Sequence, residues 1–259
     1  MRGYRVRTIG GARIDGQAVT KSQRPLVAAL VLWRKEGATI DALVDAVWPN
    51  RAPTTATNSI QNQIARLRQT FGRDLIVTTG DRYRLTATSD LELIDRVATI
   101  CDGRRLASGD THAIAYVLST WHGQPYADLP DDPRAQAERA RLHHVQSRLV
   151  EALALTRLVD PAGDLDTAIV DLTVRTSNEP LHEQAWELLV AAQHRTGRRT
   201  EALGTYARFA EVLQREVGAA PSRHFQQLRA LVDADESIDP VSVLSPAGVI
   251  VALALRATA

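Results

Sequence analysis

The sequence predicts a mainly α-helical protein with a small α+β part at its N-terminus. Three observations support this fold class. Short alternating segments with turn signals fill the first twenty residues and recur between residues 75 and 86. Apolar residues at helical spacing occupy most of the remainder. Residues 1–90 carry 14 Lys and Arg against 7 Asp and Glu, whereas residues 91–259 carry 17 against 23, so we expect two domains with different partners.

The composition excludes several classes of protein. Hydrophobic residues make up 44% of the chain and charged residues 24%, as in soluble globular proteins. A single cysteine, Cys101, excludes an internal disulfide and a cysteine-rich zinc site. The sequence has no apolar run near the roughly 18 residues of a membrane span and no apolar signal region at its start. We therefore expect a cytoplasmic protein without membrane association.

Residues 1–88 show the order of elements of a winged helix-turn-helix. Short strands are expected within residues 4–19, with a hairpin turn at Asp15-Gly16. Three helices and a basic β-hairpin follow. The second helix has Thr39 as its N-cap, and Gly72 closes the third. The expected helices span residues 23–35, 40–47 and 54–71, and the hairpin strands span residues 75–79 and 82–86.

The third helix has the chemistry of a DNA-reading helix. Its apolar residues Ile60, Ile64, Leu67 and Phe71 form one stripe, and no acidic residue occurs between positions 54 and 69. Asn and Gln pair with adenine edges and Arg pairs with guanine, which favours major-groove contact over an ordinary surface helix. The predicted DNA-binding residues are Thr55, Asn58, Ser59, Asn62, Arg66 and Arg68 on this helix, Arg82 and Arg84 on the hairpin, and Lys21 and Arg24 at the first helix.

Residues 89–233 are expected to form an all-α, tetratricopeptide-like helical domain. Ala168 and Ala202 occupy equivalent places in two similar segments 34 residues apart, which is the period of that repeat. Residues 234–259 form an acidic linker and an apolar tail, either a docked strand or the remainder of a longer parent protein. The expected helices span residues 91–106, 112–121, 133–159, 164–176, 180–196, 199–217 and 222–232.

The sequence contains no recognisable catalytic or metal-binding pattern. The segment from His182-Glu183 to Trp186 lacks the second histidine of a zinc-binding H-E-x-x-H helix. Asp164 and Asp166 are expected to be helix N-terminal charges rather than acid–base partners. We therefore expect a protein that is not an enzyme and that has neither a cofactor nor a metal.

The N-terminal motifs resemble the Streptomyces antibiotic regulatory protein family. Two positions depart from the family pattern: Arg82 stands before Tyr83 in place of the usual glycine, and Asn50-Arg51 replaces acidic residues. The matching segments are Leu43-Val44-Asp45-Ala46-Val47-Trp48, Pro53, Ala56-Thr57-Asn58-Ser59-Ile60-Gln61, Arg66-Leu67-Arg68, Phe71-Gly72, Val77-Thr78-Thr79 and Tyr83-Arg84-Leu85.

The second half resembles the helical bacterial transcriptional activation domain of the same family, so the resemblance covers about residues 1–232. The matching segments are Trp121-His122-Gly123, Tyr126-Ala127-Asp128-Leu129, Glu179-Pro180-Leu181-His182-Glu183, Gly197-Arg198, Glu201-Ala202-Leu203 with Tyr206, and Glu216-Val217-Gly218 to Pro221-Ser222.

The resemblance implies an activator with an OmpR-type winged helix that binds direct repeats in double-stranded promoter DNA, often as two copies. It also implies contact with RNA polymerase holoenzyme and control of secondary metabolism such as antibiotic biosynthesis. A helical-repeat adaptor whose basic N-terminal domain binds a protein or RNA remains the alternative. The implied polymerase-contact loop consists of Pro49, Asn50, Arg51, Ala52, Pro53 and Thr54.

Overall fold

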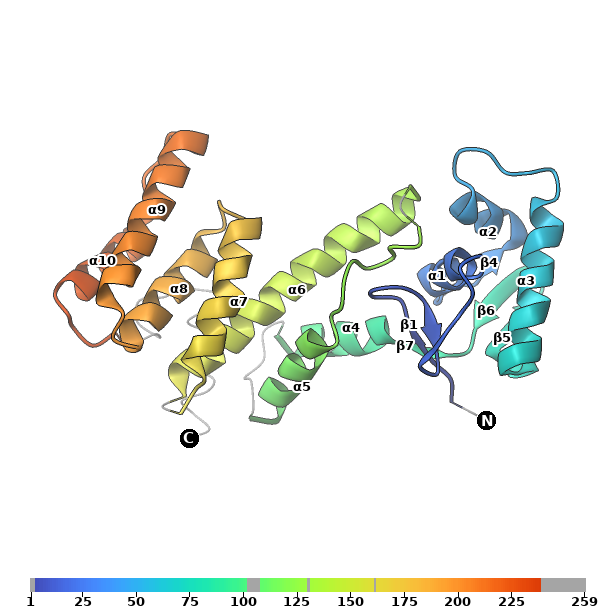
Figure 1. The fold of residues 1–259 in the computed structure, drawn as a ribbon, viewed down its shortest axis with the longest axis horizontal. Helices are drawn as coiled ribbons and strands as arrows, with labels where there is room; N and C mark the ends of the chain where they lie inside the picture. Colours follow the sequence, from blue (N-terminus) through green and yellow to red (C-terminus); the bar gives the residue numbers. More distant parts are fainter. Residues whose placement is uncertain (1–2, 102–107, 130, 161, 239–259) are drawn as a thin grey trace. The chain divides into compact units, whose positions relative to one another are not determined.

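The computed structural model describes residues 3–101, 108–129, 131–160 and 162–238. Over these residues the chain forms ten α-helices and seven short strands (Figure 1), which confirms the mainly α-helical fold class. The chain separates into two compact units. The first comprises Met1–Arg96 with Ser119–His144, and the second comprises Val97–Leu118 with Val145–Ala259. In the described part of the chain, no helix has the length and apolar character needed to cross a membrane.

A four-stranded sheet opens the first unit, with the strand order β3-β2-β1-β7. Asp15 and Gly16 both have positive φ angles (47° and 78°), as a two-residue type I′ hairpin requires, and this confirms the predicted turn. The parallel pairing of β1 with β7 was not predicted. The strands are β1 (Arg5–Arg7), β2 (Arg13–Ile14), β3 (Gln17–Ala18) and β7 (Thr88–Ser89).

The remainder of the first ninety residues forms a winged helix. Three helices are followed by a three-stranded sheet with the order β4-β6-β5, in which β5 and β6 form the wing hairpin. The third helix begins two residues later than expected, because residues 54 and 55 form a turn in which Ala56 N donates to the carbonyl of Pro53. The elements are α1 (Arg24–Leu32), β4 (Ala38–Thr39), α2 (Ile40–Val47), α3 (Ala56–Phe71), the 3-10 helix η1 (Arg73–Leu75), β5 (Ile76–Thr79) and β6 (Arg82–Leu85).

In the part of the chain that the structure describes, seven helices follow the winged helix. Of the expected helix 91–106, residues 102–106 lie outside the described residues. The helix expected from residue 180 begins at Glu183, because residues 179–182 form a turn closed by His182 N to the carbonyl of Glu179. The helices are α4 (Asp90–Cys101), α5 (Ser108–Ser119), α6 (Pro133–Val159), α7 (Leu165–Asn178), α8 (Glu183–Arg195), α9 (Arg199–Val217) and α10 (Arg223–Asp233).

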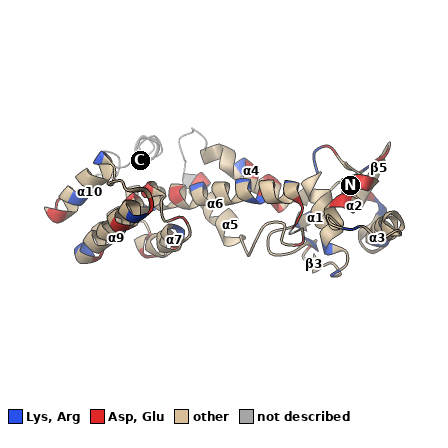
Figure 2. Cartoon of the chain, turned by 90° about the horizontal axis from the view of Figure 1, so that it is seen from above, with Lys and Arg blue, Asp and Glu red and all other residues tan. Residues whose placement is uncertain are grey.

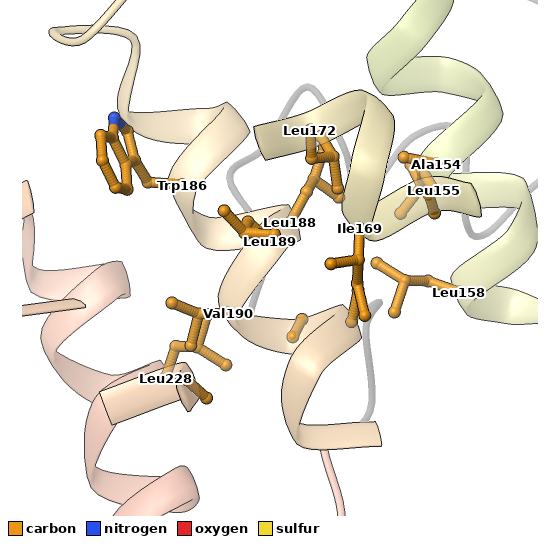
Figure 3. Close-up of a cluster of buried hydrophobic side chains, with 14 of the residues drawn as sticks. Ala154, Leu155, Leu158, Ile169, Leu172, Trp186, Leu188, Leu189, Val190 and Leu228 are labelled. Atoms are coloured by element: carbon orange, nitrogen blue, oxygen red, sulfur yellow. The ribbon is translucent and has the colours of Figure 1, made fainter. Parts of the chain in front are cut away.

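A continuous apolar core holds the helices of the second unit together. Leu155 and Leu158 of α6 pack with Ile169 and Leu172 of α7 and with the buried side of α8 (Figure 3). Three aromatic rings extend this core toward the C-terminal helices. The ring centroids are 5.6 Å apart for Trp186 and Phe209, and 5.4 Å apart for Phe209 and Phe225. Each helix therefore buries one face against the next, as in helical-repeat proteins.

The expected division after residue 88 does not coincide with the boundary between the compact units. The segment 119–129 and the start of α6 belong to the first unit. Asp128 accepts a hydrogen bond from Ala12 N (3.1 Å), and Arg139 of α6 donates to the carbonyl of Tyr126 (3.0 Å). Asp95 pairs with both Arg34 (3.1 Å) and Arg141 (2.8 Å). These contacts join α1, α4 and α6, which explains why the winged helix does not separate from them as a unit of its own.

Most of the expected linker and tail, residues 239–259, lies outside the described residues. The first part of the expected linker is packed rather than extended. Glu236 N donates to the carbonyl of Leu231, and Ile238 packs against the core of the second unit.

Candidate nucleic-acid interface

Helix α3 presents an exposed polar face opposite its buried stripe. Ile60, Ile64 and Leu67 are at most 2% exposed, whereas Asn58, Asn62 and Arg66 are exposed. Figure 2 shows no acidic residue on α3. The exposed side chains can therefore donate and accept hydrogen bonds beside a polyanion without placing a carboxylate against it.

Two of the predicted residues at the start of α3 are placed differently from the rest. Thr55 is exposed at the N-cap position, but its hydroxyl accepts no capping hydrogen bond. Ser59 is half-buried, and its hydroxyl accepts a hydrogen bond from the amide of Gln63 (3.3 Å). Gln61 was not predicted, but it is exposed on the flank of the helix, one turn after Thr57. The sequence shows that Gln61 has an amide that could contact bases. Only its position beside the central polar stripe excluded it from the predicted DNA-binding residues.

Three local features fix the position of α3. Thr39 accepts a hydrogen bond from Ala42 N (3.3 Å), which confirms its predicted role as the N-cap of α2, the helix that packs against α3. Gly72 ends α3 with a φ angle of 129°, where a side chain would be strained. A Cβ at Gly72 would also overlap the hydroxyl of Tyr4. The end of α3 is thus held against the N-terminal segment.

Arg68 connects α3 to the wing hairpin. Its Nε donates to the carbonyl of Ile76 (2.8 Å), and a terminal nitrogen donates to the hydroxyl of Thr78 (2.9 Å). The guanidinium is therefore committed to β5 and is only half-exposed. This placement gives Arg68 a positioning role within the winged helix, and its predicted DNA contact stays a prediction.

The two hairpin arginines lie on the same face of β6, because strand residues two apart share a face. Both arginines are exposed, whereas Leu85, the last residue of β6, is buried. Arg82 donates to the carbonyl of Gly37 (3.0 Å), which ties the wing to the end of the preceding turn. Arg84 makes no ion pair within the described residues. Of the two, Arg84 is the charge that the fold leaves available.

Lys21 and Arg24 lie at the start of α1. Lys21 is exposed in the turn before α1. The guanidinium of Arg24 reaches Gly11, in the turn between β1 and β2. The structure therefore places the Arg24 side chain beside this turn, and the DNA contacts predicted for Lys21 and Arg24 stay predictions.

The predicted polymerase-contact loop is a surface loop between α2 and α3. All six of its residues are exposed, and they lead into α3, the predicted DNA-reading helix. A protein that touches this loop would thus lie beside the start of α3.

In the second unit, the segment Glu179 to Glu183 lies beside a buried ion pair between Arg175 and Glu151. Arg175 lies 3.3 Å from Glu151 and also pairs with Glu179, which accepts a hydrogen bond from Ser147 (3.1 Å). Burial raises the pKa of Glu151 above its ordinary value, and the neighbouring His182 and Arg175 offset only part of this increase. This motif therefore joins α6, α7 and α8, which is a structural role.

Glu183, the last residue of that segment, reaches α10. It accepts a hydrogen bond from Ser222 N (2.8 Å), and the Ser222 hydroxyl caps α10 through Phe225 N (3.2 Å). Among the described residues, no group of three or more His, Cys, Asp or Glu could hold a metal ion.

Comparisons with known proteins agree with these features. The sequence model of the bacterial transcriptional activator domain matches residues 94–232. "Regulatory protein AfsR" of Streptomyces griseus is 33% identical over 83% of this chain, and "Regulatory protein DnrI" of Streptomyces peucetius is 28% identical over 94% of it. The match covers 96% of DnrI but 23% of AfsR, so the chain spans about a quarter of the AfsR relatives' length.

A solved structure has the same fold. The structure of Mycobacterium tuberculosis EmbR in complex with a low-affinity phosphopeptide superimposes with a TM-score of 0.74. The match covers 92% of this chain and 67% of that chain, at 24% sequence identity. Because the family model covers more than half of the sequence, this protein belongs to the bacterial transcriptional activator domain family and is of the Streptomyces antibiotic regulatory protein type.

Proposed function

We propose that the protein binds double-stranded promoter DNA by placing α3 in the major groove. The acid-free polar face of α3, with Asn62 and Arg66 exposed one turn apart, is the observation that carries this proposal. Asn reads adenine and Arg reads guanine through paired hydrogen bonds in that groove. The wing hairpin, with Arg84 available, would contact the adjacent backbone.

We further propose that two copies bind a direct repeat and recruit RNA polymerase holoenzyme. The exposed loop of residues 49–54 and the helical unit would supply the polymerase contacts, and the regulated genes would serve secondary metabolism. The similarity to AfsR and DnrI supports this assignment. Such a regulator would act beside the chromosome, in the cytoplasm.

The salt dependence of duplex binding tests this function. Neutralised phosphates release counterions, so the logarithm of the binding constant should fall with the logarithm of the salt concentration by about 0.9 per phosphate contact. The duplex is chosen by sequencing DNA retained by the purified full chain. A steep slope with preference for the retained duplex over random duplex supports the proposal. A flat response, or tighter binding of single-stranded RNA, would favour the adaptor function instead.

A further inference from the structure

The charged side chains on the outer face of the N-terminal sheet are all arginines. Side chains along β1 alternate between the two faces of the sheet. Tyr4 and Val6 are buried on one face, whereas Arg5 is exposed on the other, and Arg7 lies on the same face as Arg5. Arg13 of β2 is exposed and is the cross-strand partner of Arg7. Arg5, Arg7 and Arg13 therefore share one face, which we call the arginine face.

Within the described residues, no carboxylate pairs with the arginine face. Like charges directly opposite each other, as in Arg7 and Arg13, destabilise a sheet. The Nε of Arg7 is shielded from solvent and has no hydrogen-bond acceptor among the described residues. Arg13 donates to the backbone carbonyl of Gly16 (3.3 Å).

The carboxylates nearest to this hairpin are already used by the backbone. Asp15 accepts from Arg5 N (2.8 Å), Asp90 accepts from Thr8 N (3.0 Å) and Ile9 N (3.1 Å), and Asp128 accepts from Ala12 N (3.1 Å). The arginine face thus keeps its positive charge in the folded chain.

The arginine face points away from the DNA-reading helix. Tyr4 lies on the opposite, buried face of the sheet, and its hydroxyl touches Gly72 at the end of α3. Helix α3 is therefore on the core side of the sheet, and Figure 1 shows the sheet and α3 on different sides of α1. A duplex held by the outer face of α3 would not reach Arg7 and Arg13.

We propose that the arginine face docks an acidic segment of another protein. Guanidinium groups form strong, paired hydrogen bonds with carboxylates, so two or three Asp or Glu side chains on one strand or helix would neutralise the face. A second copy of this chain is a poorer match, because many acids of the second unit already pair with arginines of their own chain. These acids are Glu151, Asp166, Asp171, Glu179, Glu216 and Asp233.

The test uses the full chain and a fluorescent octaglutamate peptide, whose binding is followed by anisotropy. The double variant Arg7→Gln/Arg13→Gln should weaken peptide binding about tenfold, since it removes two charge-assisted contacts. The matched control, Arg96→Gln/Arg223→Gln, removes the same charge at two exposed positions elsewhere and should change binding less than about twofold. Thermal unfolding confirms that each variant is folded. If the double variant does not fold, the single variant Arg13→Gln, at an exposed position, replaces it in the binding measurement.

Duplex DNA and self-association distinguish the remaining explanations. The peptide should bind the protein–duplex complex without displacing the duplex, and the double variant should keep the duplex affinity of the control. The proposal would be overturned if the peptide displaced the duplex, or if both double variants weakened peptide binding equally. It would also be overturned if the wild type self-associated in sedimentation and Arg7→Gln/Arg13→Gln did not. Peptide binding to the free protein is measured without DNA. Its result therefore does not depend on whether the proposed DNA-binding function is correct.

Discussion

Gly10 packs its backbone directly against the backbone of His122. A Cβ at Gly10 would overlap the carbonyl oxygen of His122, and Gly10 N donates to the carbonyl of Gln124 (3.4 Å). A Cβ at Gly123 would in turn lie 3.3 Å from the Cα of Gly10. A segment that falls within the match to the activator-domain family therefore closes over the first turn of the N-terminal sheet. The winged helix and the start of the helical part are therefore stabilised together.

This contact predicts a specific effect of alanine at Gly10. Gly10 and Gly16 have similar φ angles of 75° and 78°, but a Cβ at Gly16 meets nothing within 4 Å. Gly16→Ala should cost only the left-handed strain, about 1–2 kcal/mol. Gly10→Ala should cost the same strain plus about 1–3 kcal/mol for displacing the 119–129 segment. Urea unfolding measures both; equal losses for the two variants would show that the segment does not press on Gly10.

Arg68 should act through the position of α3. Arg68→Ala removes both hydrogen bonds to β5 and should lower the free energy of unfolding by about 1–3 kcal/mol. Arg68→Lys keeps the charge but lacks the guanidinium fork, so it should lose a similar amount of stability. The matched control is Arg66→Lys at an exposed position of the same helix, which should be nearly neutral for stability. If Arg68→Lys kept full stability while Arg68→Ala lost it, charge rather than geometry would be the cause.

The buried hydroxyl of Tyr126 should contribute little to stability. The side chain is fully buried, and its oxygen has no hydrogen-bond partner within the described residues. Tyr126→Phe should therefore leave the free energy of unfolding unchanged or raise it, whereas Tyr126→Ala should cost about 3–5 kcal/mol. A loss above about 1 kcal/mol on Tyr126→Phe would reveal a hydrogen bond to this hydroxyl.

The pH dependence of stability gives a second signature of Tyr126. Burial raises the pKa of its hydroxyl above the ordinary value of 10. The folded state thus holds this proton more tightly than the unfolded state does, so its contribution is complete below pH 10 and is lost as the pH rises toward the folded pKa. The wild type should lose more stability than Tyr126→Phe above pH 10, as measured by urea unfolding across that range. Parallel losses would place the hydroxyl in solvent.

The wing and the helix should contribute differently to DNA binding. Arg84→Ala should weaken binding to specific and random duplex alike and should reduce the salt slope by about 0.9, the value for one phosphate contact. The control Arg223→Ala removes an exposed charge of the second unit and should leave the slope unchanged. A loss confined to the specific duplex would instead assign a base contact to Arg84.

The sequence was sufficient for elements whose signals are local. The helices Pro133–Val159 and Arg199–Val217 were predicted with these bounds, because Pro starts the first and Gly218, with a φ angle of 67°, ends the second. The role of Arg68 was not predicted, since helical periodicity places it on the flank of α3 without showing that β5 lies beside it. The packing of segment 119–129 was also missed. It depends on contacts such as Asp128 to Ala12, which are 116 residues apart and leave no local pattern.

Sequencing of DNA selected from a random duplex pool tests the central claim most directly. The pool is selected in parallel with the wild-type chain, with Asn62→Ala, and with Asn178→Ala, which alters an exposed Asn on α7. If α3 reads bases, the wild type and Asn178→Ala should enrich the same direct repeat. Asn62→Ala should relax one position of that repeat, at a cost of about 1–3 kcal/mol on the wild-type site. An unchanged enriched sequence with Asn62→Ala, or no enrichment with the wild type, would contradict the assignment of α3 as the DNA-reading helix.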